Sequence, residues 1–424
     1  MSSLLRLALA SAWNRRGTLG LVLASIALST ALLWTLEGMR RDLRSSFSQA
    51  VSGTDLVIGA RGGSVQLMLY AVFRVGGATN GISMDSVRAV SGHRAVAWTV
   101  PIALGDSYRG FPVLGTTTGY FQHFAYGDRQ ALAVASGRVF SGQLDGLYET
   151  VLGAEVARQL GHRLGDRITL THGMGPTPGM EHADKAFTVT GILQPTGTPV
   201  DRTVHVSLQA LQAIHLDWVG GAPMPGLRIS AEDARKFDLE PRQVTAALVG
   251  LKSRAAVFMV QRYVSEYREE PLMAVLPGVA LDELWQALGL GERALQLVCA
   301  LVALVSLAGL VATVLAGLNE RRRELAVLRA MGAGPRDVMG LLVLEGAVVT
   351  SAGVVVGVLA ALGAQALAGP LLQAHFGIQL QWDTPAATQW GMMAGVLAAG
   401  MLASLLPAWR AYRLSLADGL SPRL

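Results

Sequence analysis

Four apolar stretches, each long enough to cross a lipid bilayer, constrain the fold of this chain more than any other feature. They cover residues 18–36, 294–318, 338–367 and 384–409. A spanning helix needs roughly 20 predominantly apolar residues, and these stretches are apolar around the whole helix circumference. The chain is 51% hydrophobic and only 15% charged. These properties predict an integral membrane protein and argue against an ordinary soluble enzyme.

The long region between the first and second stretches has a different character and predicts a mixed α+β domain. Short β-branched runs, turn signals and helical stretches alternate there. Strands are predicted at residues 54–58, 95–102, 167–170, 186–193, 203–206 and 255–260, helices at residues 207–216 and 241–251, and an exposed loop at residues 173–179. The only cysteine, Cys299, lies in an apolar stretch, so disulfides within one chain cannot stabilise this domain.

The distribution of arginine predicts which side of the membrane each loop faces. Positive residues collect in cytoplasmic loops. The loop between the second and third spans carries Arg321, Arg322, Arg323, Arg329 and Arg336, whereas the loop before the fourth span has no lysine or arginine. We therefore expect both termini and the arginine-rich loop in the cytoplasm and the large domain in the periplasm. The first apolar stretch is longer than that of a usual signal peptide, starts late and is followed by no clean A-x-A site, so we expect an uncleaved anchor. The net charge of +5 is attributed to this topology signal and not to a nucleic-acid partner.

The arginine-rich loop also has a pattern that suits docking to another protein. It reads Glu320-Arg321-Arg322-Arg323-Glu324-Leu325-Ala326-Val327-Leu328-Arg329-Ala330-Met331-Gly332-Ala333. Leu325, Leu328 and Met331 share one side of a helix, and the glycines that follow, with Pro335, are expected to stop it. The alternative is a basic segment that lies on anionic lipid.

Other motifs lie in the last two spans. Glu345 interrupts the apolar third span, where a carboxylate is costly, and two interpretations stay open: contact with protein, or a position at the membrane interface. Gly353 and Gly357 would allow close helix approach. The fourth span ends in Pro407-Ala408-Trp409-Arg410-Ala411-Tyr412-Arg413, whose arginines would hold the helix end at the lipid surface.

With these motifs and this layout, the chain resembles the FtsX-like family of ABC transporter permeases, which includes the permeases of the lipoprotein-release system and of the MacB macrolide exporter. A short amphipathic segment at residues 4–16 is similar to the family's interfacial helix, and residues 152–157 with 164–170 resemble its periplasmic core. A minor departure is Ser415-Leu416, where the family usually has a proline. The implied fold has four transmembrane α-helices, with a large α+β extracytoplasmic domain inserted between helices 1 and 2.

The expected organisation follows this layout from end to end. It comprises a cytoplasmic interfacial amphipathic helix at residues 1–17, transmembrane helices at residues 18–38, 291–318, 338–368 and 387–409, a periplasmic MacB-like core at residues 39–290, a cytoplasmic coupling helix at residues 319–337, a short periplasmic loop at residues 369–386 and a cytoplasmic tail at residues 410–424.

The resemblance implies that the arginine-rich loop is a coupling helix that docks on an ATPase. The implied coupling residues are Glu320, Arg321, Arg322, Arg323, Glu324, Leu325, Leu328, Arg329, Met331 and Gly332, and residues with membrane or structural roles are Glu345, Gly353, Gly357, Pro407, Arg410 and Arg413. The chain has no Gly-Lys-Ser/Thr phosphate loop and no catalytic motif. We therefore expect no enzyme activity and no cofactor in this chain, with ATP and magnesium bound by a separate subunit.

The expected partners are an ABC ATPase subunit, a second permease copy or a paralogue, and membrane lipid. A periplasmic protein is a further possible partner, and no nucleic acid is expected. The leading hypothesis is a mechanical permease in the bacterial inner membrane that exports or extracts a periplasmic or lipid-anchored substrate. A second is an FtsX-like regulator that activates a periplasmic cell-wall hydrolase without transport. A third, from another class, is a membrane-anchored binding protein without a motor.

Histidines concentrate in one part of the large domain. They are His162, His172, His182, His205 and His215. Such a histidine-rich patch could bind metal. However, no pair has the tight spacing of a helical ligand site, so we interpret them as scattered surface residues and predict no metal site.

Overall fold

A computed structural model describes residues 16–77, 80–173, 180–219, 221–320, 327, 329–376 and 386–413. The chain forms two compact units. The helical unit contains Met1–Asp42, Gly289–Leu371 and Leu380–Leu424, and the α/β unit contains Leu43–Leu288 and Leu372–Gln379. The predicted fold class is confirmed, because the described residues contain 4 helices that are long and apolar enough to cross a membrane, with an α/β unit inserted between the first and the second.

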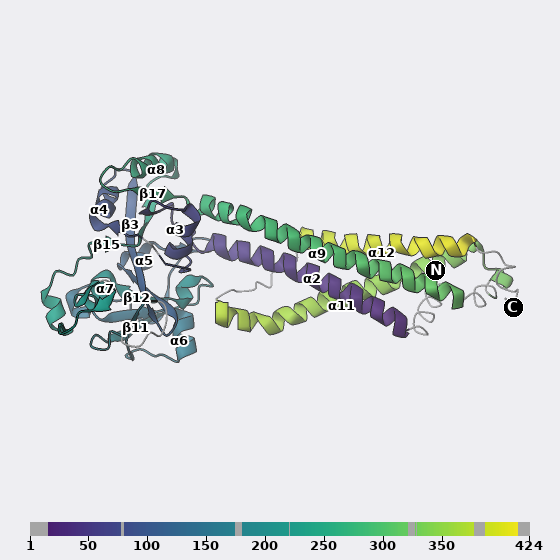
Figure 1. The fold of residues 1–424 in the computed structure, drawn as a ribbon, viewed down its shortest axis with the longest axis horizontal. Helices are drawn as coiled ribbons and strands as arrows, with labels where there is room; N and C mark the ends of the chain where they lie inside the picture. Colours follow the sequence, from purple (N-terminus) through teal and green to yellow (C-terminus); the bar gives the residue numbers. More distant parts are fainter. Residues whose placement is uncertain are drawn as a thin grey trace. The chain divides into compact units, whose positions relative to one another are not determined.

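The four long helices are α2 (Arg16–Gln49), α9 (Pro277–Glu320), α11 (Pro335–Phe376) and α12 (Ala387–Arg413) (Figure 1). Each is longer than the apolar stretch that predicted it. For example, α9 begins at Pro277, a residue that suits the first turn of a helix because it needs no backbone donor there. The sequence after Pro277 is more polar but contains no further proline before the span, so the helix continues beyond its apolar part.

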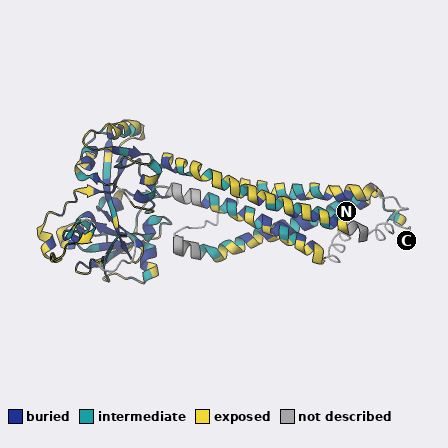
Figure 2. Ribbon diagram, in the orientation of Figure 1, coloured by how far each residue is buried: buried dark blue, intermediate teal, exposed yellow. Residues whose placement is uncertain are grey.

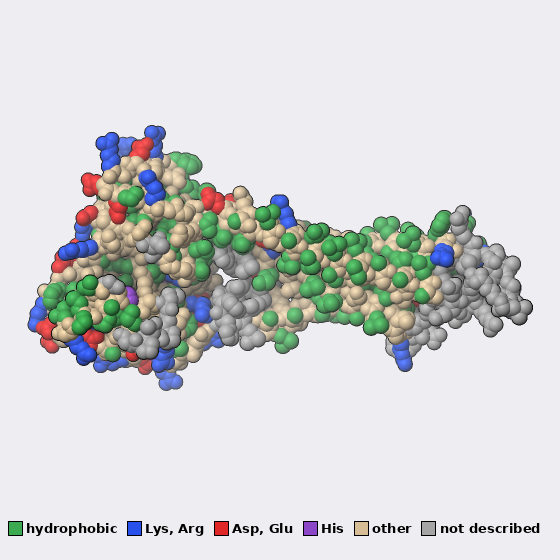
Figure 3. Space-filling model, in the orientation of Figure 1, with side chains coloured by type: hydrophobic (Ala, Val, Ile, Leu, Met, Phe, Trp, Pro, Cys, Tyr) green, Lys and Arg blue, Asp and Glu red, His purple; other side chains and the backbone are tan. Residues whose placement is uncertain are grey.

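Apolar side chains cover the outside of the helical unit. Figure 2 shows many exposed positions along the four helices, and in Figure 3 hydrophobic side chains spread over the visible face of these helices. More than half of the surface of several large side chains is exposed, as at Leu21, Leu28, Leu297, Val305, Leu359 and Leu402. A soluble protein rarely leaves such a continuous apolar surface uncovered, whereas a lipid bilayer would cover it.

The α/β unit is built on one large sheet. The strand order is β17 (Leu272–Val275), β1 (Leu56–Ala60), β16 (Ala246–Leu251), β3 (Val96–Tyr108), β4 (Phe111–Thr116), β12 (Val204–Ser207), β8 (Glu149–Leu152), β11 (Phe187–Leu193) and β7 (Val134–Gly137). Two short strands join it, since β10 (Thr171–His172) pairs with β3 and β9 (Arg167–Ile168) pairs with β11. The pairs β12–β4 and β11–β8 are parallel, and the other pairs are antiparallel.

Short helices and small hairpins complete this unit. The α-helices are α3 (Ser64–Ala71), α4 (Met84–Ser91), α5 (Gly119–His123), α6 (Ala154–Leu160), α7 (Leu208–Ile214) and α8 (Val257–Ser265). The 3-10 helices are η1 (Leu144–Gly146), η2 (Pro199–Arg202), η3 (Asp233–Lys236) and η4 (Arg254–Ala256). The small strand pairs are β2 (Ile82–Ser83) with β15 (Gln243–Val244), β5 (Ala125–Tyr126) with β6 (Gln130–Ala131), and β13 (Trp218–Val219) with β14 (Ala222–Pro223).

The central strands are buried on both faces of the sheet. In β1, Val57 belongs to one hydrophobic cluster, while its neighbours Leu56 and Ile58 belong to another. Successive side chains of a strand point to opposite faces, so each face packs against its own layer. This double burial explains why β1 and β16 are continuously apolar instead of alternating.

Most predicted elements of the α/β unit are confirmed. The strand predictions at residues 54–58, 95–102, 167–170, 186–193 and 203–206 correspond to β1, β3, β9, β11 and β12, and the helix prediction at residues 207–216 corresponds to α7. The predicted loop at residues 173–179 lies outside the described residues except for Gly173, as do the predicted amphipathic segment up to residue 15, residues 377–385 of the predicted short loop, and the tail beyond Arg413.

Two secondary-structure predictions are wrong. Residues 241–251 were expected to form a helix but contain β15 and the buried strand β16, because a fully buried strand has no polar face and its alanines and leucines also suit a helix. Residues 255–260 were expected to form a strand but belong to η4 and α8. There, Val260 and Val264 are buried one helical turn apart, which places an amphipathic helix on the sheet.

Candidate functional site

The segment after α9 contains the predicted coupling residues, and only part of it is described. Arg321, Arg322, Arg323, Glu324, Leu325 and Leu328 lie outside the described residues, and Glu320 is the last residue of α9. In the described remainder, the Met331 N–H donates to the Val327 carbonyl at 3.0 Å, as in a helix. Met331 is 72% exposed, while Arg329 is half-buried.

This helical turn ends at Gly332, where the chain reverses into α11. Gly332 has a φ of 101°, a left-handed conformation that favours glycine. The Asp337 carboxylate then accepts a hydrogen bond from the Gly334 N–H at 2.8 Å, which satisfies a free donor at the start of α11. The local sequence therefore builds a tight turn between the described residues 329–331 and α11.

Glu345 lies inside the helical unit, on α11. It is 1% exposed, so its side chain faces protein and not lipid. Next to it, an added Cβ at Gly346 would overlap the Ser404 side chain of α12. One turn further, an added Cβ at Gly400 would lie 2.5 Å from Thr350 Cγ2. Small residues thus bring α11 and α12 into close contact beside the buried carboxyl group.

The predicted glycine pair lies against a different helix, α2. An added Cβ at Gly353 would lie 2.8 Å from Ile26 Cγ2, and one at Gly357 would lie 2.5 Å from the Ala27 carbonyl oxygen. A backbone atom cannot move away easily, so any side chain larger than that of glycine at position 357 would clash with α2. Both glycines occupy a close helix crossing.

The long helices also make polar contacts that were not predicted from the sequence. The hydroxyl oxygens of Ser25 and Ser29 on α2 lie 2.8 Å and 2.9 Å from that of Ser306 on α9. Near the other end of α2, Arg40 donates to Glu292 of α9 at 3.0 Å. These residues are isolated in the sequence, and no local pattern pairs them. They connect α2 to α9 at two levels.

The C-terminal motif lies at the end of α12. Pro407 is buried within the helix, and Arg410 is exposed. Arg413 is the last residue of α12. An exposed arginine at a helix end can reach the polar surface of a membrane while its stem covers apolar residues.

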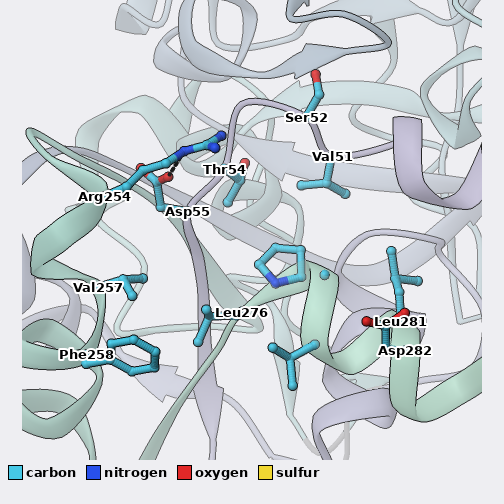
Figure 4. Close-up of a pocket in the computed structure, with 13 residues that line it drawn as sticks. Val51, Ser52, Thr54, Asp55, Arg254, Val257, Phe258, Leu276, Leu281 and Asp282 are labelled. Carbon is cyan, nitrogen blue, oxygen red and sulfur yellow. Dashed lines mark ion pairs between the residues drawn. The ribbon is translucent and has the colours of Figure 1, made fainter.

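The α/β unit contains a pocket of about 590 Å³ next to the start of α9 (Figure 4). Its walls include Leu281 and Asp282 of α9, and Val257 and Phe258 of α8. On one side of the pocket, Arg254 Nε lies 3.6 Å from Asp55 Oδ1, which forms an ion pair. Phe258 is 73% exposed, so the pocket has an accessible apolar rim.

The interpretation of the histidines as scattered surface residues is wrong. His182 and His205 are almost completely buried. Moreover, His172, His182 and His215 gather with Asp106 in the α/β unit, with one potential ligand atom from each residue within 4.8 Å of the others. Sequence spacing did not reveal this cluster because its members come from four separate segments.

Comparison with known proteins agrees with the architecture. Residues 18–267 match the family model of the MacB-like periplasmic core domain, and residues 297–416 match that of the FtsX-like permease C-terminal region. The chain belongs to the FtsX-like permease family with a MacB-like periplasmic core domain. This result confirms the resemblance seen in the sequence. FtsX-like permeases of this type are components of ABC transporters.

One relative of this FtsX-like permease is the lipoprotein-releasing system transmembrane protein LolC of Neisseria meningitidis, at 26% identity over 240 residues. The match covers 55% of the chain and 52% of LolC, so it spans about half the length of this relative. The periplasmic region of MacB from Actinobacillus actinomycetemcomitans aligns with a TM-score of 0.34 and 10% identity, over 56% of this chain and 94% of that one. The extracellular domain of the noncanonic ABC-type transporter YknZ from Gram-positive bacteria aligns with a TM-score of 0.30 and 14% identity, over 52% and 99%.

Proposed function

We propose that this chain is the permease subunit of an ABC transporter in the bacterial inner membrane. It couples ATP hydrolysis by a separate ATPase subunit to movements of its periplasmic domain, which export or extract a periplasmic or lipid-anchored substrate. This chain itself binds no nucleotide, and ATP and magnesium belong to the partner subunit. Membership of the FtsX-like family supports this function.

The observation that carries the proposal most directly is the continuity of α9. This helix has 44 residues and runs from Pro277 to Glu320 without interruption. At 1.5 Å per residue it is about 66 Å long, roughly twice the apolar thickness of a bilayer. Only Leu276 separates it from β17, which ends at Val275. A stiff helix joined so closely to a sheet can transmit a displacement that a flexible linker would absorb.

The opposite end of α9 leads into the arginine-rich segment. In the described part of that segment, Val327 and Met331 expose 54% and 72% of their surface, which leaves an apolar edge for a partner. The turn at Gly332 then connects this edge to α11. An ATPase docked here would therefore act on two long helices at once.

A second permease copy would complete the assembly. On α9, Leu297, Leu301 and Leu304 lie at spacings of four and three residues, and each exposes more than half of its surface. This is the spacing of a helix-packing stripe. A second copy of this chain or a paralogue could cover this stripe in place of lipid.

The decisive experiment combines copurification with a pair of matched variants. We expect the full-length protein, extracted in detergent from its native host, to copurify with an ATPase. Replacing both Leu325 and Leu328 with Asp should abolish that association, because charges would disrupt the apolar side of the helix that the sequence predicts there. The control is Leu144→Asp with Leu227→Asp, since these leucines are exposed in the α/β unit. Unchanged copurification after the first pair of substitutions, or no ATPase with the native protein, would refute the coupling model.

The same linkage also suits regulation of an extracytoplasmic protein, such as a cell-wall hydrolase, without transport. The observation that favours this second function is the pocket near α9, because its exposed Phe258 and Val279 resemble a protein-binding rim. Reconstitution with the ATPase in proteoliposomes separates the two functions. Substrate movement supports the permease, while ATP-dependent activation of a bound hydrolase, lost in Phe258→Ser, supports the regulator.

A further inference from the structure

The histidine cluster of the α/β unit has the composition of a transition-metal site. It contains the imidazoles of His172, His182 and His215 and the carboxylate of Asp106. Neutral imidazoles bind zinc and similar divalent ions, and a carboxylate is a common fourth ligand. Neither the proposed transport function nor the coupling segment involves these residues.

The backbone places three of these residues by sheet pairing. Asp106 on β3 lies directly opposite His172 on β10. The Thr171–Glu181 bridge then brings the next segment alongside, with the His172 N–H donating to the Met180 carbonyl and the His182 N–H to the Leu170 carbonyl. His172 and His182 are therefore diagonal neighbours on one face of this pairing.

The fourth residue, His215, comes from the C-terminal end of α7. Its Nδ1 lies 2.8 Å from the Leu211 carbonyl oxygen, a contact in which only the ring can donate. In a neutral ring this hydrogen bond places the proton on Nδ1, so Nε2, which lies 3.0 Å from His172 Nδ1 in the cluster, can act as a ligand. Metal-binding histidines are usually oriented by such a bond from the other ring nitrogen to a backbone carbonyl.

The distances between the potential ligand atoms suit tetrahedral coordination. His172 Nδ1 lies 2.9 Å from Asp106 Oδ1 and 3.0 Å from His215 Nε2, while His215 Nε2 lies 3.4 Å from Asp106 Oδ1. Ligands at about 2.1 Å from a tetrahedral zinc ion are about 3.4 Å apart. The ligand atom of His182 stays within 4.8 Å of the others, so a side-chain movement on the order of 1 Å completes the set.

Two buried groups in the cluster have polar atoms without partners among the described residues. His182 is 1% exposed, and neither of its ring nitrogens has a hydrogen-bond partner. Asp106 is 2% exposed, and its Oδ2 likewise has none. Buried polar atoms are nearly always satisfied, so two such groups beside two further potential ligands favour a cation bound at this position.

The charge of a lysine near the cluster is already balanced by carboxylates. The nearby Lys185 is paired with Asp184 and Asp217 at 2.9 Å and 3.1 Å, so its charge is already balanced.

We propose that Asp106, His172, His182 and His215 bind one divalent transition-metal ion of the Zn²⁺ class. Four protein ligands leave no open position for substrate, which is typical of a structural site and not of a catalytic one. The ion would hold together four segments of the α/β unit, namely β3, β10, the segment of His182 and the C-terminal end of α7. Trp218, with its ring centroid 4.5 Å from that of His182 and 5.1 Å from that of His172, covers one side.

The test uses the full-length protein in detergent, carrying an affinity tag without histidine. After chelator treatment, the protein is titrated with Zn²⁺ alone in competition with a chromogenic chelator, and bound zinc is measured by mass spectrometry. We expect one zinc ion per chain in the native protein. Loss of a ligand should weaken binding by on the order of 100-fold or more, since even outer contacts contribute 10–100-fold. His182→Gln and Asp106→Asn remove ligands from different segments.

The matched control is His162→Gln. His162 is also paired with a carboxylate, with its Nδ1 3.1 Å from Asp166 Oδ2, but it lies outside the cluster. We expect this variant to bind zinc as the native protein does. A second measurement is Co²⁺ absorption, which should show the intense visible bands of tetrahedral coordination in the native protein and the control.

The proposal is overturned if the chelator-treated native protein does not bind zinc, or if His182→Gln and Asp106→Asn retain native affinity. Equal loss in His162→Gln and the ligand variants would also overturn it. Zinc binding to the native protein is measured without any substitution. A lack of binding there would refute the proposal even if one variant did not fold. ATPase association is measured separately with the leucine variants, so failure of one proposal does not affect the other.

Discussion

Replacing Gly357 with alanine tests whether α2 and α11 depend on a close crossing. The added Cβ would lie 2.5 Å from the Ala27 carbonyl oxygen and 2.7 Å from Thr30 Cβ. Both contacts are far inside the ordinary carbon contact distance of about 3.5–4.0 Å, and the first is to a backbone atom. The two helices must therefore move apart or bend to accept one methyl group.

The expected magnitude follows from two opposing effects. Overpacking of a dense interior costs about 1–3 kcal/mol. Alanine is a better helix former than glycine by about 0.8–1.0 kcal/mol, which offsets part of that cost. We expect a net destabilisation of about 1 kcal/mol, and a larger one for Gly357→Val. For a domain of 150–250 residues, 1 kcal/mol corresponds to a decrease in Tm of about 2–4 °C.

Gly363→Ala on the same helix is the matched control. An added Cβ there meets nothing within 4 Å, so only the gain in helix propensity remains. Thermal unfolding of the purified proteins, followed by tryptophan fluorescence in one detergent, compares the two variants. The reasoning is refuted if Gly357→Ala is at least as stable as Gly363→Ala.

Other predictions concern the α/β unit. Burial, together with the nearby Arg74, lowers the pKa of His205 to about 3, so the native state resists protonation that the unfolded chain undergoes near pH 6.5. Stability should therefore decrease as the pH falls from about 6.5 to about 3, by up to roughly 5 kcal/mol, and denaturation of His205→Asn should depend less on pH in this window. Lys185→Met should destabilise the protein by about 3 kcal/mol in chemical denaturation, because it leaves the buried Asp217 without its cation. Adding Asp217→Asn should restore most of that loss, and an additive double variant would contradict the ion pair.

Much of the architecture was predictable because its signals are local. The four spans follow from the length of uninterrupted apolar sequence, and Ala294 to Leu318 needs no tertiary information to be identified as a candidate membrane-spanning helix. Strands such as β3 and β11 were recognised from β-branched residues between turn signals. In contrast, β16 was mistaken for a helix, since a strand covered on both faces loses the alternation that distinguishes it.

For the candidate sites, too, the sequence indicated local properties of single residues but not their partners. Gly353 and Gly357 could be identified as a close-packing pair, but the sequence did not indicate that they face α2. The contacts of Ser306 with Ser25 and Ser29 were not predicted at all, because single serines in apolar helices carry no information about their partners. The described part of the coupling segment adds the exposed Met331 and the left-handed Gly332.

A membrane protein with four spans, an inserted α+β domain and an arginine-rich loop of the FtsX-like type can be predicted from the amino-acid sequence. Those predictions need composition and spacings of a few residues, because apolar length and helical periodicity are local properties. The contacts between the helices, and the meeting of Asp106, His172, His182 and His215, could be seen in the folded chain but not in its sequence. Their proximity results from pairing between β3 and β10 and from the position of α7, and contacts between distant segments leave no spacing pattern in a single chain.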